Sequence, residues 1–207
     1  AGYTQIYSNQ HAFAAIKNPN TVVALAPALA PALAPALAPA LAPALAPALA
    51  DGSIAAWGRS GYGGDDAPTD AGYTQIYSNE DAFAAIRADG SITAWGRSGY
   101  GSDSAPTDAG YTQVYSTGYA FAAIRANGSI TAWGGYGGDD APTSAGYTQI
   151  YSNRYAFAAI KADGSITAWG HSGYGGDGAP TDAGYTQIYA NRYAFAAIKA
   201  DGSITAW

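Results

Sequence analysis

The chain has 207 residues, and 48% of them are hydrophobic, which is enough apolar surface for one all-β domain or one repeat array. It contains no cysteine, so disulfide bonds, thiolate metal sites and cysteine nucleophiles are excluded. The net charge is −6 and the 9 Lys and Arg residues are scattered singly, which argues against nucleic acid as a partner.

A tandem repeat organises the whole chain. The segment Ala-Gly-Tyr-Thr-Gln begins at Ala1, Ala71, Ala109, Ala145 and Ala183. Tryptophan follows the same period, with spacings of 38, 38, 36 and 38 residues. We therefore divide a single array, 1–207, into units 1–70, 71–108, 109–144, 145–182 and 183–207. The third unit is shorter because it lacks the Arg-Ser pair of the second, so that Gly134 runs directly into Gly135.

The first unit is longer than the others because residues 18–49 form a low-complexity insertion of Pro, Ala and Leu. Its uncharged stretch is long enough for a transmembrane helix. However, proline recurs every four residues, and each interior proline costs a helix ~3 kcal/mol, so we expect no membrane span. The insertion is expected to be polyproline II or disordered, either as a semi-rigid spacer or as a repeat expansion without function.

Each unit is predicted to be a three-stranded meander followed by a loop. In the second unit we expect strands over 73–77, 82–86 and 92–95, an Asp89-Gly90 hairpin turn and a loop over 99–108. The first strand alternates and is rich in β-formers, and the second is a continuous apolar run typical of a strand buried on both faces. Asp-Gly favours a two-residue turn. Such a meander has two apolar faces to bury, so the units must stack on one another, with core residues Phe83, Ile86, Ile92 and Trp95.

The stretch from Phe83 to Gly96, FAAIRADGSITAWG, resembles the core of the RCC1-type repeat, and it occurs five times. The resemblance implies β-propeller blades, so the expected fold is all-β, a tandem repeat of three-stranded meanders that is five-bladed and β-propeller-like. An open β-solenoid-like stack is the alternative, because residues 105–108 are too short for the fourth strand of an RCC1-type blade. The nucleotide exchange and chromatin binding known in that family are not implied, because the residues for them are not identifiable here.

No catalytic constellation is found, so we expect the chain not to be an enzyme. The two histidines, His11 and His171, occupy non-equivalent positions, and Glu80 is the single glutamate. No glycine-rich phosphate loop precedes a helix, so the glycines are interpreted as turn residues.

Two kinds of loop residue are candidates for binding. One tyrosine per loop lies between glycines that cannot shield it, and such rings can stack on sugars; these are Tyr62, Tyr100, Tyr136 and Tyr174. The alternative is that each tyrosine packs over its own loop. Aspartates in the same loops are candidate oxygen ligands for Ca²⁺, namely Asp65, Asp66, Asp139 and Asp140. No other cofactor is expected.

These patterns support two hypotheses of function. The first is a non-catalytic structural or adhesive segment of a larger bacterial cell-surface or extracellular protein, which associates with itself in a longer array or filament. The second is a carbohydrate-binding, lectin-like propeller whose loops bind surface glycans or proteins. Few charged residues and many Tyr, Thr, Ser and Gly predict the extracellular or cell-surface location. Because the chain begins at Ala1 without a signal peptide, we expect it to be part of a longer protein.

Overall fold

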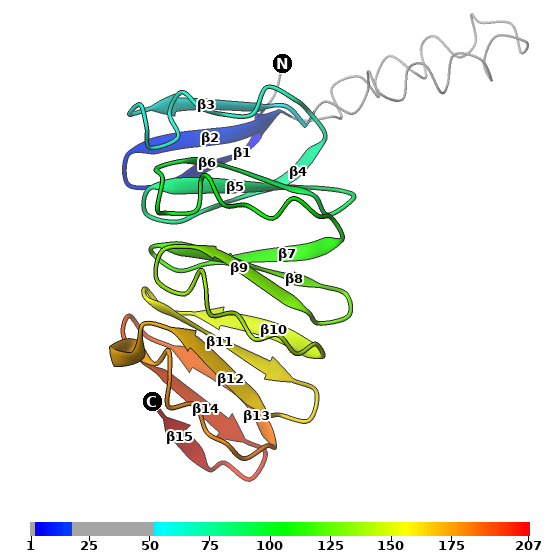
Figure 1. The fold of residues 1–207 in the computed structure, drawn as a ribbon, viewed down its shortest axis with the longest axis vertical. Helices are drawn as coiled ribbons and strands as arrows, with labels where there is room; N and C mark the ends of the chain where they lie inside the picture. Colours follow the sequence, from blue (N-terminus) through cyan, green and yellow to red (C-terminus); the bar gives the residue numbers. More distant parts are fainter. Residues whose placement is uncertain (1–2, 18–51) are drawn as a thin grey trace, which may run out of the picture.

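The computed structural model describes residues 3–17 and 52–207, so the insertion predicted at residues 18–49 lies outside the described residues. The described part is all-β and consists of five three-stranded antiparallel sheets, each with its strands in sequential order (Figure 1). The strands are β1 (Tyr3–Ser8), β2 (Ala12–Lys17), β3 (Ile54–Gly58), β4 (Tyr73–Ser78), β5 (Ala82–Arg87), β6 (Ile92–Gly96), β7 (Tyr111–Ser116), β8 (Ala120–Arg125), β9 (Ile130–Gly134), β10 (Tyr147–Ser152), β11 (Ala156–Lys161), β12 (Ile166–Gly170), β13 (Tyr185–Ala190), β14 (Phe195–Lys199) and β15 (Ile204–Ala206). A short 3₁₀ helix, η2 (Ser172–Tyr174), lies in the loop after β12.

The structure confirms the predicted meander in every unit. In the second unit β4, β5 and β6 each begin at the predicted residue and end one residue later than predicted. The apolar run at the start of β5 is buried throughout, as expected for a strand covered on both faces. The predicted core side chains of this unit, with Phe83 at 0% and Trp95 at 4% exposure, are also buried.

The hairpin turn between the second and third strands differs from the prediction. The N–H of Arg87 donates to the carbonyl of Ser91 at 3.0 Å, so three residues, Ala88 to Gly90, form the loop instead of two. Only Gly90 has a positive φ, +79°, whereas the two-residue turn typical of Asp-Gly needs positive φ at both central positions. The Asp89 carboxylate instead accepts hydrogen bonds from the backbone N–H and the hydroxyl of Ser91, which holds the turn closed.

Each sheet has two chemically different faces because side chains alternate along its strands. In β5, Ala82, Ala84 and Ile86 pack toward the third unit, whereas Phe83 and Ala85 pack toward the first unit. We call the first the alanine face. The second, which we call the aromatic face, also carries Tyr and Ile from the first strand and Trp from the third strand.

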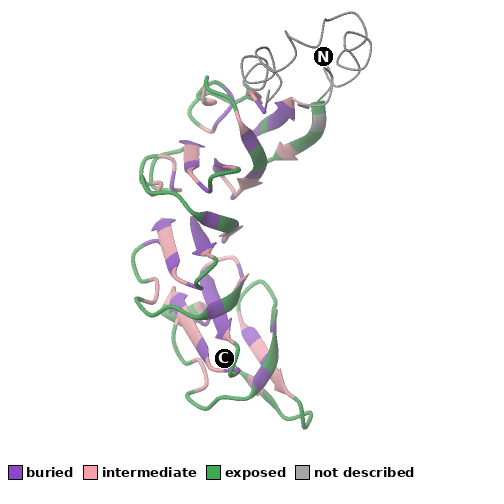
Figure 2. Ribbon diagram, turned by 90° about the vertical axis from the view of Figure 1, so that its right-hand side faces the viewer, coloured by how far each residue is buried: buried purple, intermediate pink, exposed green. Residues whose placement is uncertain are grey.

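The core lies between consecutive sheets, where the alanine face of one unit meets the aromatic face of the next. In Figure 2 the buried residues, in purple, accordingly lie mainly within the strands. The third and fourth units meet through Ala120, Ala122, Ile124 and Ile130 on one side and Tyr147, Ile150, Phe157, Ala159 and Trp169 on the other. The rings of Phe157 and Trp169 stack with centroids 5.2 Å apart. Alanine methyl groups leave the space that these rings fill, which explains why a small residue recurs in the second strand.

Backbone hydrogen bonds fix the spacing of the sheets. One set, which we call the turn ladder, joins the turns between first and second strands, from Gln10 N to Glu80 O (3.1 Å), Glu80 N to Gly118 O (3.2 Å), Gly118 N to Arg154 O (2.8 Å) and Arg154 N to Arg192 O (3.3 Å). At the other edge the hairpin turn of one unit accepts from the first strand of the next, as where Tyr111 N donates to Gly90 O at 3.2 Å. Consecutive units are thus tied together at both edges.

The two ends of the described stack each leave one face uncovered. The sheets β1–β3 and β13–β15 lie at opposite ends (Figure 1). At the first unit the aromatic face is exposed, and Ile6 is 65% exposed where its equivalent Ile76 is 1% exposed. At the last unit the alanine face is exposed, and Ile204 is 68% exposed where its equivalent Ile92 is 7% exposed. Each end therefore presents an apolar surface that interior units bury.

The tryptophan of the third unit lacks a hydrogen bond that its equivalents make. The indole N–H groups of Trp95, Trp169 and Trp207 donate to carbonyls of the preceding loop at 3.2, 3.0 and 3.1 Å. The N–H of Trp133 is buried and finds no acceptor among the described residues. In the preceding loop, Ser102 takes a position that is glycine in the other loops. At Gly64, one of those glycines, a Cβ would lie 2.5 Å from the backbone of Gly58, so a serine cannot follow the same path.

We expect Ser102→Gly to stabilise the protein by about 1 kcal/mol. A buried polar group without a partner costs ~1–3 kcal/mol, which exceeds the ~0.4–1 kcal/mol that the added glycine costs through the unfolded chain. The measurement is the urea midpoint. The reverse change, Gly138→Ser, places a Cβ against the backbone of Gly134 and should destabilise. A lower midpoint for Ser102→Gly would show that Ser102 is not what displaces the loop.

Candidate functional site

One side of the stack, which we call the loop face, gathers the parts of the repeat that differ most between units. Its turns, between first and second strands, are residues 9–11, 79–81, 117–119, 153–155 and 191–194. Its loops, which follow the third strands, are residues 59–66, 97–104, 135–140 and 171–178. All the binding residues predicted from the sequence lie in these loops.

An asparagine in the turn connects the turn to the loop of the same unit. The Asn79 side-chain oxygen accepts hydrogen bonds from the N–H groups of Asp81 and Ala82 at 3.1 and 2.8 Å. Its side-chain nitrogen donates to the carbonyl of Tyr100 at 2.7 Å. Asn153 donates in the same way to Tyr174. The asparagine therefore places the loop tyrosine beside the turn.

The four predicted tyrosines are not equally accessible. Tyr136 is 53% exposed, whereas Tyr62, Tyr100 and Tyr174 are only partly exposed. In the first two loops an arginine of the same loop covers the ring, with Arg59 4.3 Å from the Tyr62 centroid and Arg97 4.9 Å from the Tyr100 centroid. The expected exposure next to glycine thus applies to Tyr136 and is wrong for the other three.

The structure adds tyrosines that the sequence analysis did not select. The third turn position is Tyr119, Tyr155 or Tyr193 in the last three units. Tyr119 lies 5.3 Å from Tyr100 and 5.6 Å from Tyr136, between ring centroids. The Tyr155 ring stacks on Tyr119 at 5.4 Å and continues the row toward the fourth loop. The rings of consecutive units therefore form a continuous aromatic row, although the same turn position holds His11 and Asp81 in the first two units.

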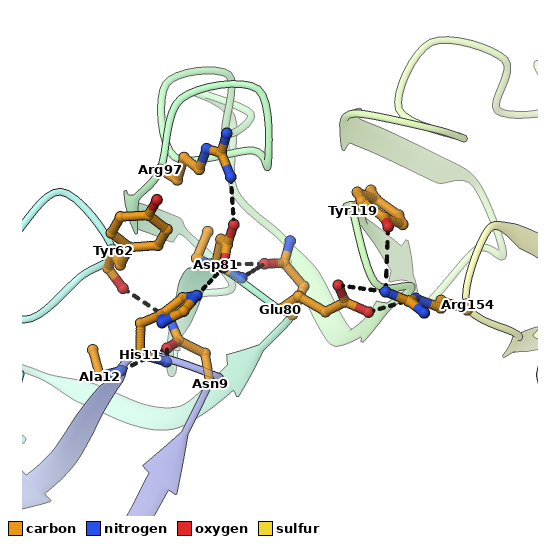
Figure 3. Close-up of polar contacts among 11 residues, drawn as sticks. Asn9, His11, Ala12, Tyr62, Glu80, Asp81, Arg97, Tyr119 and Arg154 are labelled. Carbon is orange, nitrogen blue, oxygen red and sulfur yellow. Dashed lines mark hydrogen bonds and ion pairs between the residues drawn. The ribbon is translucent and has the colours of Figure 1, made fainter. Parts of the chain in front are cut away.

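In the first two units the third turn position takes part in a charged group instead of the aromatic row. Figure 3 shows Asp81 between Arg97 and His11, at 2.8 Å from the guanidinium and 3.4 Å from the imidazole. Asp81 is 5% exposed, so its carboxylate is stabilised mainly by these partners. Asp81 in turn raises the pKa of Arg97. We interpret this group as structural, because the charges of Asp81 and Arg97 are paired with each other and not directed at a ligand.

A second ion pair joins units that are not neighbours. Arg154 Nε lies 2.7 Å from Glu80, and the same guanidinium donates to Glu80 at 3.0 Å and to the Tyr119 hydroxyl at 3.4 Å (Figure 3). Glu80 belongs to the second unit and Arg154 to the fourth. Gly118 of the third unit lies between them, and a Cβ there would come within 2.8 Å of the Glu80 carboxylate. The ion pair between the glutamate of one unit and the arginine two units later therefore depends on a glycine at the same turn position of the unit between them.

A hollow of about 510 Å³ opens on the loop face at the third unit, where the predicted tyrosines and aspartates meet. Its side-chain lining consists of Tyr100, Tyr119, Tyr136, Asp139 and Asp140, and the rest is glycine. Burial raises the pKa values of Tyr100 and Tyr119, so both hydroxyls stay protonated at neutral pH and can donate hydrogen bonds. The hollow brings together two predicted tyrosines and the second predicted aspartate pair.

The other predicted residues are not brought into a shared site. Asp65 accepts a hydrogen bond from the N–H of Gly61 at 3.2 Å, and hydrogen bonds from Ser60 and Gly61 lower its pKa. Among residues 3–17 and 52–207 no three His, Asp or Glu side chains gather as metal ligands. Calcium binding at Asp65, Asp66, Asp139 and Asp140 stays a prediction. His171 caps η2 and contacts Tyr136 and Tyr174, so it contributes to the aromatic row.

Comparisons with known proteins identify the fold. No family model and no curated protein matches the chain. The CRINKLY WD40 ectodomain of the Arabidopsis thaliana receptor kinase ACR4 matches 99% of this chain and 63% of its own, with 15% identity and a TM-score of 0.55. The fold is β-propeller-like. The ectodomain of the Physcomitrella patens receptor kinase CR4 matches 99% of this chain and 50% of its own, with 15% identity and a TM-score of 0.58. Prp20p of Saccharomyces cerevisiae matches 99% of this chain and 57% of its own, with 11% identity and a TM-score of 0.53.

These similarities extend to the fold alone. Since Prp20p is the yeast RCC1 protein, an RCC1-like repeat fold agrees with the resemblance of the Phe83–Gly96 segment. The chain spans between 50% and 63% of the length of the three structures. In the described residues there is no helix with the length and apolar character needed to cross a membrane.

Proposed function

We propose that the chain is a non-catalytic repeat scaffold whose two end faces bind further units of the same repeat, as part of a structural or adhesive array outside the cell. The observation that carries this proposal is the exposure of Ile6 and Ile204, at 65% and 68%, at positions that interior units bury. Exposed apolar surfaces of this kind mark interaction sites. In the interior of the stack an alanine face packs on an aromatic face, which supports the pairing of one end face with the other.

The exposed aromatic face of the first unit is complementary to the exposed alanine face of the last unit, and neither face is complementary to a second copy of itself. At the last unit Tyr189 and the alanine-face residues Ala194 and Ala196 help to line a hollow of about 250 Å³. In the fourth unit the equivalent of Tyr189, Tyr151, packs against the cluster that holds Ile188 of the following first strand. The equivalent of Ile188 in the first unit is Ile6. The aromatic face of one molecule therefore fits the alanine face of a second in a head-to-tail interface.

A mixing experiment tests this interface. Unmodified protein is expected to show a mass that rises with concentration in analytical ultracentrifugation. Ile6→Glu and Ile204→Glu should each weaken association at least about 100-fold, because a charge would be buried without a partner. Both positions are exposed in the single chain, so neither change should lower the urea midpoint. An equimolar mixture should form a dimer and nothing larger, since each variant keeps the one face that the other has lost.

Other outcomes would contradict the proposal. If one variant alone still dimerises, the interface joins identical faces and the head-to-tail arrangement is wrong. If unmodified protein remains a monomer at millimolar concentration, the end faces do not bind further units.

The loop face supports a second candidate function, carbohydrate binding, which is the second hypothesis drawn from the sequence. The observation behind it is the continuous row of tyrosine rings that includes Tyr100, Tyr119 and Tyr136. Tyrosine combines a flat apolar face with a polar hydroxyl, which suits the alternating apolar and hydroxyl surfaces of a sugar. Prp20p, which has a similar fold, binds Gsp1p and histones, so protein partners are the competing class for this face.

A further inference from the structure

We propose that the hollow at the third unit is a single binding site for a neutral oligosaccharide, with Tyr100, Tyr119 and Tyr136 as its stacking surface. This inference rests on the carbohydrate-binding function proposed for the loop face and narrows it to one place. The sequence alone suggested one site per unit, whereas the structure builds the hollow from two features that, among the described units, occur together in the third alone. These are a shortened loop and a tyrosine at the third turn position.

The first such feature is the shortened loop. The second loop has Arg97 and Ser98 after its glycine, and Arg97 covers the Tyr100 ring. The third loop lacks this pair, and Tyr136 is the most exposed of the loop tyrosines. Gly135 follows instead, and a Cβ there would lie 3.0 Å from the carbonyl of Gly99. The deletion therefore opens the space that a longer loop with an arginine would fill.

The second feature is Tyr119, which lines the hollow and contacts both Tyr100 and Tyr136. The last two units also have a tyrosine at this turn position, but only Tyr119 belongs to a unit with the shortened loop. The equivalent residues in the first two units are His11 and Asp81, which are engaged with each other. Tyr119 touches the rings on both sides and lies at 38° to one and 86° to the other. Two ring directions in one hollow can contact two faces of a bent oligosaccharide.

The spacing of the rings favours a sugar over a cation. An aromatic cage holds a quaternary ammonium group between rings, with the cation within ~6 Å of each centroid. Here the centroids are 5.3 and 5.6 Å apart, so the rings touch and leave no space between them for such a group. They form an angled surface on which the apolar faces of sugar rings can stack.

The polar lining selects against anions. Asp139 and Asp140 are exposed at the rim and can accept hydrogen bonds from sugar hydroxyls. No Lys, Arg or His is among the residues that line the hollow. The nearest arginines, Arg97 beside Tyr100 and Arg154 beside Tyr119, are already paired with Asp81 and Glu80. A phosphate, sulfate or carboxylate would therefore meet two negative charges, whereas a neutral polyol would meet acceptors and tyrosine hydroxyl donors. A hollow of about 510 Å³ is large enough for a short oligosaccharide.

Calorimetric titration with a panel of tetrasaccharides tests the proposal. The neutral probes are glucose, mannose, galactose and N-acetylglucosamine oligomers, and the controls are a sulfated oligosaccharide and choline. We expect a neutral probe to bind with a stoichiometry of one per chain. Tyr136→Ala should weaken that binding about tenfold or more, whereas Tyr62→Ala, the equivalent change outside the hollow, should leave it unchanged.

An insertion provides a second variant that leaves every tyrosine in place. Adding Arg-Ser between Gly134 and Gly135 gives the third loop the length of the second, and should abolish binding while the urea midpoint stays the same. If a sugar binds but Tyr62→Ala weakens it as much as Tyr136→Ala, the single site is wrong and carbohydrate binding by the loop face stands. If no neutral probe binds at millimolar concentration, or if choline or the sulfated probe binds instead, both proposals are overturned.

Discussion

Replacing Phe157 by alanine is expected to destabilise the protein by about 3–5 kcal/mol, the range for deleting a buried phenylalanine ring. Phe157 is fully buried between the third and fourth sheets and stacks on Trp169. Its loss leaves a cavity that the neighbouring alanines cannot close, because they are already on rigid strands. Urea denaturation measures the change in the free energy of unfolding.

Phe13→Ala is the matched control for this change. Phe13 occupies the same repeat position and also stacks on its tryptophan, but it lies on the uncovered aromatic face and is 46% exposed. Its substitution should cost about 1 kcal/mol, since much of the ring already contacts water. Equal losses for the two variants would mean that stability comes from each sheet separately and not from the contact between sheets.

Replacing Gly164 by alanine is expected to lower the free energy of unfolding by about 3 kcal/mol or more. Gly164 has φ +78°, which strains any side chain, and a Cβ would overlap the backbone N and O of Tyr185 in the next unit. The change therefore combines backbone strain of ~1–3 kcal/mol with the loss of the Tyr185 N to Gly164 O hydrogen bond, worth ~1 kcal/mol. The thermal and urea midpoints both report it.

The last unit contains the same turn sequence without the neighbour. Gly202 follows the identical Lys-Ala-Asp and has φ +86°, yet a Cβ there would meet nothing within 4 Å. Gly202→Ala should cost only the strain, about 1–2 kcal/mol. The difference between the two variants measures how closely consecutive units approach at this edge. If Gly164→Ala is no worse than Gly202→Ala, that close contact does not form.

The repeat made the fold predictable because each strand carries its own signal. Alternation in residues 73–77 and the apolar run in residues 82–86 depend only on neighbours in sequence, and both strands were located to within one residue. The hairpin turn was predicted one residue too short. Asp-Gly is compatible with several turns, and the choice depended on whether the Asp89 side chain bonds to Ser91, which the sequence pattern does not reveal.

The candidate site was less predictable because its contacts join different units. Tyr100 and Tyr136 were selected from their glycine neighbours, but Tyr119 was not, since a single tyrosine in a turn carries no signal of its own. The Glu80–Arg154 pair is separated by 74 positions and becomes visible only when the turns are stacked in register. An alignment of the five turns shows that the residue type at this position varies from unit to unit. Only the stacked structure shows that the side chains of the second and fourth units reach each other.

The pair between Glu80 and Arg154 also bears on the order in which the units come apart. In most repeat proteins each unit interacts only with its nearest neighbours, so unfolding begins at an end and moves inward one unit at a time. Here the side chains of the second and fourth units meet over Gly118 of the third. This adds a coupling between next-nearest neighbours, so we expect the second, third and fourth units to unfold as one cooperative block and the first and fifth units to fray before them.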